Sequence, residues 1–516
     1  MSDPDTPPHS HVEGDHESPS ALEALEAAAE GLVGSIALSP GGPTPSLGGE
    51  LLLPGGTTQE QVGSDSVRSG ILQAGPLALA GVFANGINVV VTVLVARALT
   101  TRDYGLLNQL TGIFLIISMP GSAIIVAIVR RVTMWTTAGD ANRVRDWARR
   151  LHTQGTLVTA AFFVAMVIAG EWVASLLHQP NAVGVVAIVG AGAVWILLSI
   201  DRGLLQAHRD YRTLAVNLVV EGGARTIGII GFVALGTGAS GIAVGVLLAE
   251  IVTAVQARVS ADRAWDHELG EGAPQSPLSR AAKRVQHPIV ASRVWLHHLR
   301  SDPRMVAPRG LKVEMILDLT VALSVLAMLA VLQNVDVIVL GRDNPGMSGS
   351  YAAVSVASKA IVYGAVVLGS YLLPEAAIRW RQGSHALRQA AVALLLLCVP
   401  AGLLLIVSEF FPSLLLRLVF SPRYLGAQEA FAPLVVAMVC LSFTVILTMY
   451  LLAIGWRWIS LLLLVGAVSA TVAVVIAHGR PSTTARNDLI VQVVLLGVVI
   501  ASFVTLHRKR RPVISP

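Results

Sequence analysis

Long apolar segments, separated by shorter polar ones, follow one another along most of the chain. Each has about the 20 residues that an α-helix needs to cross a hydrocarbon core of about 30 Å. The pattern predicts an all-α polytopic membrane protein with about twelve transmembrane helices, because barrel strands would alternate apolar and polar residues over about ten positions. The predicted spans are 71–98, 105–129, 153–177, 182–200, 213–236, 239–257, 314–341, 349–375, 388–408, 427–454, 457–477 and 487–507.

The positions of the basic residues support this number of spans. With the N-terminus placed in the cytoplasm, 27 of the 37 Lys and Arg residues fall in predicted cytoplasmic loops and six fall in outside loops. Cytoplasmic loops of membrane proteins are rich in Lys and Arg, and one missed span would exchange the sides of every later loop. The sequence therefore predicts a multi-pass protein of the cell (plasma or inner) membrane with both termini in the cytoplasm.

The same pattern divides the chain into five regions. Residues 1–67 contain eleven Asp and Glu and no Lys or Arg, and they are predicted to be a disordered acidic cytoplasmic tail. Spans one to six form a predicted N-lobe, 68–257, and spans seven to twelve form a C-lobe, 314–507. Both halves begin inside and have an even number of spans, so two pseudo-symmetric six-helix lobes are expected. Residues 258–313 are a predicted cytoplasmic linker, and 508–516 are a basic cytoplasmic tail.

A lone acid and a lone base interrupt the apolar hairpin 332–375. A charge at the centre of a spanning helix costs about 2.5–3.5 kcal/mol on insertion scales, so such a residue usually has a function. Lys359 lies roughly 15 Å deep at 1.5 Å per residue; either it contacts a substrate phosphate, or it pairs with Asp336 or Glu250. Asp336 either binds a coupling cation, carries a proton, or pairs with Lys359.

A second charged pair lies in predicted span five. Arg225 follows Glu221 by four residues, a spacing that places both side chains on one helix face. They either neutralise each other as a buried ion pair, or Arg225 faces a substrate cavity while Glu221 tunes its charge. Glu250, in the middle of span six, is a further candidate for ion coupling.

Five other residues are candidates for lining a substrate path. Two are arginines at the ends of spans, where long side chains can also reach the membrane interface. Three are asparagines inside spans, where hydrogen bonding between helices is the alternative role. The five are Arg97, Arg130, Asn85, Asn88 and Asn217.

The sequence shows no motif of a catalytic or nucleotide-binding site. The segment GTGASG, Gly236–Gly241, matches GxGxxG, but it lies in a tight turn between two spans with no strand before it. A Walker A sequence, a zinc-ligand spacing and a catalytic-triad pattern are all absent from the sequence. We therefore expect a protein that is not an enzyme, uses no cofactor or metal, and binds no nucleic acid.

Several stretches occur in a recognisable order on the predicted spans: VARALTTRDYGLLNQL, PGSAIIVAIVRR, LLQAHRDYRTLAVNLVVEGGAR, and QNVDVIVLGRDN with the later GSYAAVSVASKA and LPEAA. A weaker one is FPSLLLRLVFSPRYLGAQEAF. Together they resemble the polysaccharide biosynthesis and export flippases of the MATE-like multidrug/oligosaccharidyl-lipid/polysaccharide superfamily. The resemblance covers about 71–507, without the acidic tail and much of the linker.

This resemblance implies a flippase that moves a lipid-linked oligosaccharide or related cell-envelope glycolipid across the membrane by alternating access. The implied partners are a polyprenyl-linked glycolipid, the lipid bilayer, Na⁺ or H⁺, and glycosyltransferases or other polysaccharide assembly proteins. Two alternatives remain open at this point. One is a multidrug or cation antiporter of the same superfamily, and the other is a non-transporting scaffold of a polysaccharide assembly complex.

Overall fold

A computed structural model describes residues 87–88, 90–137, 141–208, 210–271, 309–381 and 387–509. These ranges are almost entirely helical and contain no strand. Eleven helices within them are long and apolar enough to cross a membrane, and they correspond to predicted spans two to twelve. The predicted fold class, an all-α polytopic membrane protein, is therefore confirmed. Residues 90–98 form the described end of the predicted first span, while the acidic tail and Asn85 lie outside the described residues.

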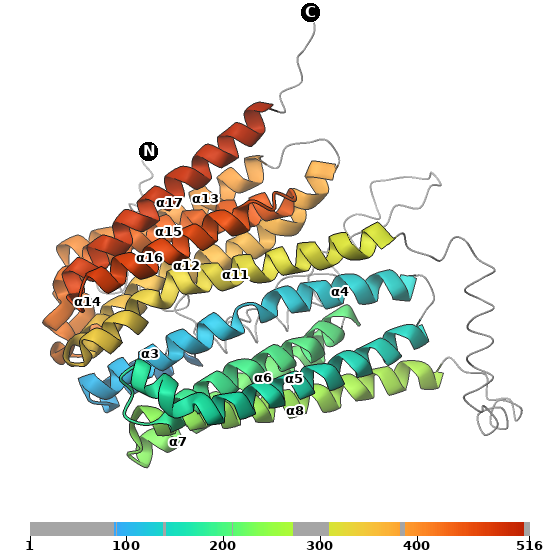
Figure 1. Cartoon of the computed structure of the whole chain (residues 1–516), viewed down its shortest axis with the longest axis horizontal. Coiled ribbons are helices and arrows are strands. Elements are labelled where there is room, and N and C mark those ends of the chain that lie inside the picture. The colour runs from blue at the N-terminus through green and yellow to red at the C-terminus, as the bar shows by residue number, and fades with distance from the viewer. Residues whose placement is uncertain are drawn as a thin grey trace, which may run out of the picture.

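Apart from α3, the helices before the linker pack mainly on one another. Helix α6 contacts α4, α5 and α8, and α7 packs along α8. These N-terminal helices appear in blue to green in Figure 1. They are α3 (Thr101–Ser118), α4 (Gly121–Thr137), α5 (Ala141–Leu176), α6 (Ala182–Ala207), α7 (Tyr211–Ala234) and α8 (Gly238–Glu271).

The helices after the linker form a second group, coloured yellow to red in Figure 1. Helix α15 packs against α12, α13 and α17, and α11 packs against α16. A short 3₁₀ helix, η1 (Pro422–Ala430), connects α14 to α15. The α-helices of this group are α11 (Arg309–Asp343), α12 (Pro345–Arg381), α13 (Leu387–Phe410), α14 (Pro412–Val419), α15 (Phe431–Ala453), α16 (Ile459–Ile476) and α17 (Pro481–Lys509).

Several helices extend beyond the predicted spans. Helix α8 continues to Glu271 and α11 already begins at Arg309, so both edges of the predicted linker are helical. Predicted span two is divided into α3 and α4 around Met119 and Pro120. Proline lacks the backbone N–H that would continue the helical hydrogen bonds, which explains the break at this position.

Helix α3 connects the two groups, because it contacts α6 and α8 on one side and α11 and α12 on the other. Its start is fixed by Thr100, whose hydroxyl accepts a hydrogen bond from the Asp103 backbone N–H at 3.1 Å. Its approach to α12 requires glycine: a Cβ on Gly349 would lie 1.8 Å from the Thr101 carbonyl oxygen. The contact between the two groups is therefore very close at this end of α3.

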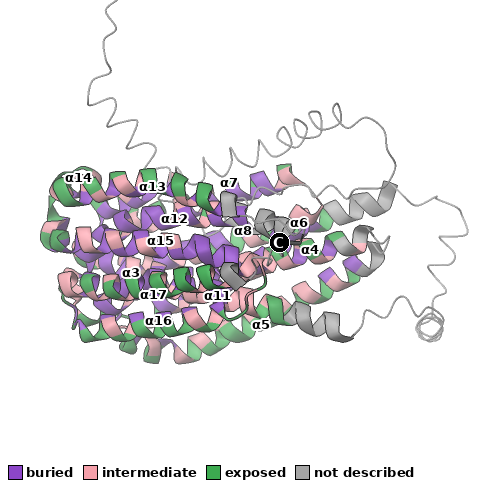
Figure 2. Ribbon diagram, turned by 90° about the horizontal axis from the view of Figure 1, so that it is seen from above, coloured by how far each residue is buried: buried purple, intermediate pink, exposed green. Residues whose placement is uncertain are grey.

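The outer faces of the peripheral helices are apolar and exposed. Figure 2 shows green outer faces on α5, α13 and α16, around the buried residues of α12 and α15. On α5, Leu157, Ile168 and Trp172 are among the exposed large apolar side chains. A continuous exposed apolar surface of this kind is typical of helices that face lipid, in agreement with the predicted spans.

Candidate functional site

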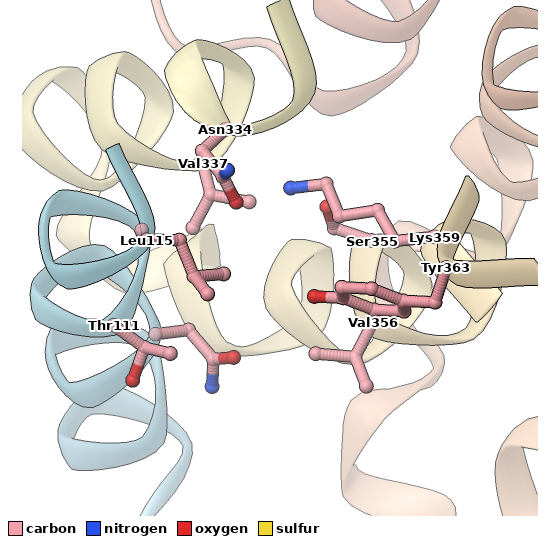
Figure 3. A pocket seen from close by; sticks show the side chains of 10 residues that line it. Thr111, Leu115, Asn334, Val337, Ser355, Val356, Lys359 and Tyr363 are labelled. Atoms are coloured by element: carbon pink, nitrogen blue, oxygen red, sulfur yellow. The ribbon is translucent and has the colours of Figure 1, made fainter. Parts of the chain in front are cut away.

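A small cavity lies between α3 of the first group and α11 and α12 of the second. In Figure 3, α3 is on one side and the ammonium of Lys359 points into the space from the other, toward Asn334. The cavity has a volume of about 20 Å³, which is room for about one water molecule. Its lining residues are Asn108, Thr111, Gly112, Leu115, Asn334, Val337, Ser355, Val356, Lys359 and Tyr363.

Lys359 also forms a buried ion pair with Asp336, which is one of the alternatives that the sequence left open. Its Nζ lies 3.2 Å from Asp336 Oδ1, and the two residues are 5% and 1% exposed. The other carboxylate oxygen of Asp336, Oδ2, accepts hydrogen bonds from the Tyr351 hydroxyl at 3.1 Å and the Ser355 hydroxyl at 3.2 Å. Asp336 thus accepts contacts from three donors, and Lys359 also faces the cavity.

A second carboxylate belongs to the same cluster and was not predicted from the sequence. Asp488 on α17 is fully buried, and its charge acts on both Asp336 and Lys359. Its Oδ1 accepts a hydrogen bond from Gln492 Nε2 at 3.2 Å, while its Oδ2 and the Gln492 Oε1 have no hydrogen-bond partner. Two carboxylates and one ammonium leave one negative charge in excess when all three are ionised, and an unbalanced buried charge is very costly.

The charged residues of α6, α7 and α8 form a separate buried network. Arg202 Nη2 lies 2.5 Å from Glu221 Oε2, and Arg225 Nη2 lies 2.8 Å from Glu221 Oε1. Arg225 also pairs with Glu250. All four side chains are at most 6% exposed. Two guanidinium groups and two carboxylates balance, so this network differs in net charge from the cluster around Asp336.

Asn217 extends this network toward α8. It accepts a hydrogen bond from Arg202 Nε at 2.7 Å and donates to the Thr253 carbonyl at 3.1 Å and to Gln256 Oε1 at 2.5 Å. The structure therefore shows the helix–helix hydrogen bonding that was one of its two predicted roles. Arg225 likewise occupies an ion pair and is not among the residues lining the cavity.

The remaining predicted residues lie away from the cavity. Arg97 is exposed and donates a hydrogen bond to the Leu418 carbonyl at 2.6 Å. Arg130 is exposed directly after predicted span two, 105–129, and Asn88 is buried near the start of the described residues. None of these three side chains lines the cavity between α3, α11 and α12.

Two charged residues of the buried clusters were missed for a common reason. Arg202 was placed in a predicted loop, but α6 continues to Ala207 and buries it. The sequence places Asp488 at the outer end of the last predicted span, but α17 begins at Pro481 and Asp488 lies two turns inside it. The spacing of Asp488 and Gln492, one helical turn apart, is the signal that could have indicated a polar helix face.

None of the described residues form a group of three or more His, Cys, Asp or Glu side chains suited to a metal ion. The two buried charged clusters combine carboxylates with Arg or Lys. Such sets can hold a proton, a monovalent cation or an anionic group through charge-assisted contacts.

The arrangement of helices matches that of known membrane transporters. No family model matches the chain, and no curated protein is similar to it in sequence. An inward-facing multidrug resistance MATE family transporter of the MOP superfamily has a TM-score of 0.54 and 14% identity, covering 81% of this chain and 96% of that chain. The Vibrio cholerae MATE transporter VcmN has a TM-score of 0.52 and 12% identity, covering 87% and 99%.

The chain therefore has the fold of MATE family transporters of the MOP superfamily, and its helices are those of a multi-pass membrane protein. At these identities the similarity concerns the fold alone. The predicted resemblance is confirmed at that level, while the particular branch, the polysaccharide flippases, stays a prediction.

Proposed function

We propose that this protein is an alternating-access transporter that moves an anionic glycolipid, such as a polyprenyl-linked oligosaccharide, across the cell membrane. One observation carries the proposal: Lys359, a cation in a spanning helix, faces a cavity between the two groups of helices. A fixed ammonium can replace part of the hydration of a phosphate or pyrophosphate by a charge-assisted contact. The lipid tail could remain in the bilayer while the polar head passes between the groups.

The small size of the cavity supports a binding site that opens when the helices around it move apart. With room for about one water molecule, it cannot hold an oligosaccharide in the conformation described. Binding would require α3 to separate from α11 and α12, which is the rocking movement that alternating access needs. The distribution of Lys and Arg predicts that both termini lie in the cytoplasm. Glycosyltransferases remain the expected partners on that side of the membrane.

When Asp336, Asp488 and Lys359 are all ionised, the one negative charge in excess in their cluster supports coupling to a monovalent cation. A proton or Na⁺ near Asp336 and Asp488 would remove the charge imbalance of this cluster. Glu221 and Glu250, the other two candidates for ion coupling, already face two arginines. The proposed coupling site is therefore the cluster on α11, α12 and α17.

A multidrug antiporter is the second candidate function, and the carboxylate that pairs with Lys359 favours it. The buried carboxylate of Asp336, which pairs with Lys359 at the cavity, would suit a cationic drug if Lys359 moved away. Purified protein in liposomes distinguishes the two candidates: one assay follows fluorescent lipid-linked oligosaccharide, and the other follows ethidium. We expect movement of the glycolipid and none of ethidium above empty liposomes; the reverse result would establish the antiporter instead.

A further inference from the structure

The helix of residues 90–98 ends against the second group of helices. The last carbonyl groups of a helix have no partner within it. Here Arg423 Nη2 donates to the Ala96 carbonyl at 2.8 Å and to the Arg97 carbonyl at 2.5 Å, and the Tyr424 hydroxyl donates to the Ala96 carbonyl at 2.6 Å. Side chains of η1 thus cap a helix that belongs to the other half of the chain.

Two further contacts surround this cap. Arg97 donates in the opposite direction, to the Leu418 carbonyl on α14 at 2.6 Å. The ring of Tyr104, at the start of α3, lies 5.3 Å from that of Tyr424 and 6.3 Å from that of Phe420. These three aromatic residues are at most 1% exposed. Polar contacts at the rim and a packed aromatic core therefore close one end of the boundary between the groups.

We propose that Arg423 and Tyr424, with Arg97 and the aromatic residues Tyr104 and Phe420, form a latch that closes the cavity toward the α14 end. The inference rests on the proposed alternating-access function. It assigns a role to two of the stretches that carry the family resemblance, since the stretch around Tyr104 meets the stretch around Tyr424. The distribution of Lys and Arg predicts that this end faces outside, so the latch is an outer gate.

The chemistry of the latch suits reversible opening. When the groups separate, water can replace the protein partners of the guanidinium, the hydroxyl and the carbonyls. The net strength of each such hydrogen bond is consequently much smaller than its strength in an apolar medium. A gate closed only by buried apolar side chains would lack this compensation, because its apolar surface would be transferred directly into water.

A cysteine-labelling experiment tests the latch without any substrate. The background chain carries Cys398→Ser and Cys440→Ser, and Thr111→Cys provides one thiol in the cavity lining. A membrane-impermeant maleimide is added to spheroplasts or to inside-out vesicles. Arg423→Ala should raise the labelling rate from the α14 side about tenfold, since it removes two charge-assisted contacts. Tyr424→Phe should raise it less, because the ring remains.

The matched control is Arg417→Ala, which removes an exposed arginine from the neighbouring α14. Its labelling rate should equal that of the background chain. The latch is wrong if Arg423→Ala labels no faster than Arg417→Ala, or if labelling rises equally from both sides of the membrane. Labelling does not depend on transport, so a confirmed latch in a protein that moves no glycolipid would leave the latch standing and overturn the proposed substrate.

Discussion

Lys359 has two roles in the structure, since it neutralises Asp336 and supplies the positive charge of the cavity. The net charge of its cluster therefore depends strongly on which member is removed. Without Lys359, two carboxylates stay buried with no cation; without Asp336, Lys359 and Asp488 still balance. The same fold thus predicts unequal responses to the loss of either partner in a single ion pair.

The first prediction concerns this inequality. Lys359→Met should lower the free energy of unfolding by about 3–5 kcal/mol, the cost of leaving a buried charge without its partner. Asp336→Asn should cost clearly less, and adding Asp336→Asn to Lys359→Met should recover part of the loss, because one buried carboxylate then remains instead of two. Thermal melting in detergent measures all three variants. Equal losses for the two single variants would contradict the excess negative charge assigned to the cluster.

The network of α6, α7 and α8 makes the second prediction. Arg225→Met leaves Glu221 and Glu250 with Arg202 alone, so we expect a loss of about 3–5 kcal/mol. Adding Glu250→Gln restores the balance of charges and should recover much of the melting temperature. A substrate-binding arginine with no structural role would behave differently: Arg225→Met would then melt like the wild type and lose only transport.

At the scale of helices, the packing of α3 against α12 depends on glycine. Gly349→Ala would place a methyl group against the Thr101 carbonyl, and we expect a loss of about 1–3 kcal/mol from overpacking. Gly364→Ala, on the same helix, is the matched control, because its Cβ would meet only the Leu397 side chain at 3.9 Å. Alanine favours helices by up to about 1 kcal/mol over glycine, so the control should melt at the same or a higher temperature.

The helices could be predicted from the sequence far better than their contacts. Apolar length fixes each span because the bilayer has a nearly constant thickness, which is why eleven described helices match the predicted spans. The pair Glu221–Arg225 was also predictable, since both residues lie on one helix. Its neighbours Arg202 and Glu250 come from two other helices, and only the packing of α6, α7 and α8 brings them together.

Buried charged residues near the ends of spanning helices are harder to predict than the apolar spans themselves. Arg202 lies beyond its predicted span, where the sequence pattern expects a loop, and Asp488 lies at the outer end of the last predicted span. In the structure, each is buried beside polar partners: Gln492 on the same helix for Asp488, and Glu221 and Asn217 on α7 for Arg202. Hydropathy contains no information about such partners, so these two site residues could not be predicted from it.

At the scale of the whole molecule, alternating access requires the α14 end to open. Cysteines in place of Arg97 and Leu418, on a background with Cys398→Ser and Cys440→Ser, allow a short bifunctional thiol reagent to join the two groups. We expect the cross-linked protein to lose nearly all translocation and to regain it when the cross-link is cleaved. Cysteines in place of Trp458 and Leu461, both exposed and within one group of helices, provide the control. Full activity in the protein linked at Arg97 and Leu418 would show that this end does not open.

The most direct test of the proposed function uses the combined Lys359→Met and Asp336→Asn variant, which removes the ion pair and leaves Asp488 as the one carboxylate of the cluster. Wild type and variant are reconstituted in proteoliposomes, and the translocation of fluorescent lipid-linked oligosaccharide is measured with matched amounts of folded protein. If Lys359 contacts the anionic head group, wild type should move the lipid and the variant should be at least about tenfold slower, because a charge-assisted contact is lost. Equal rates for the two proteins would contradict a role for Lys359 in transport.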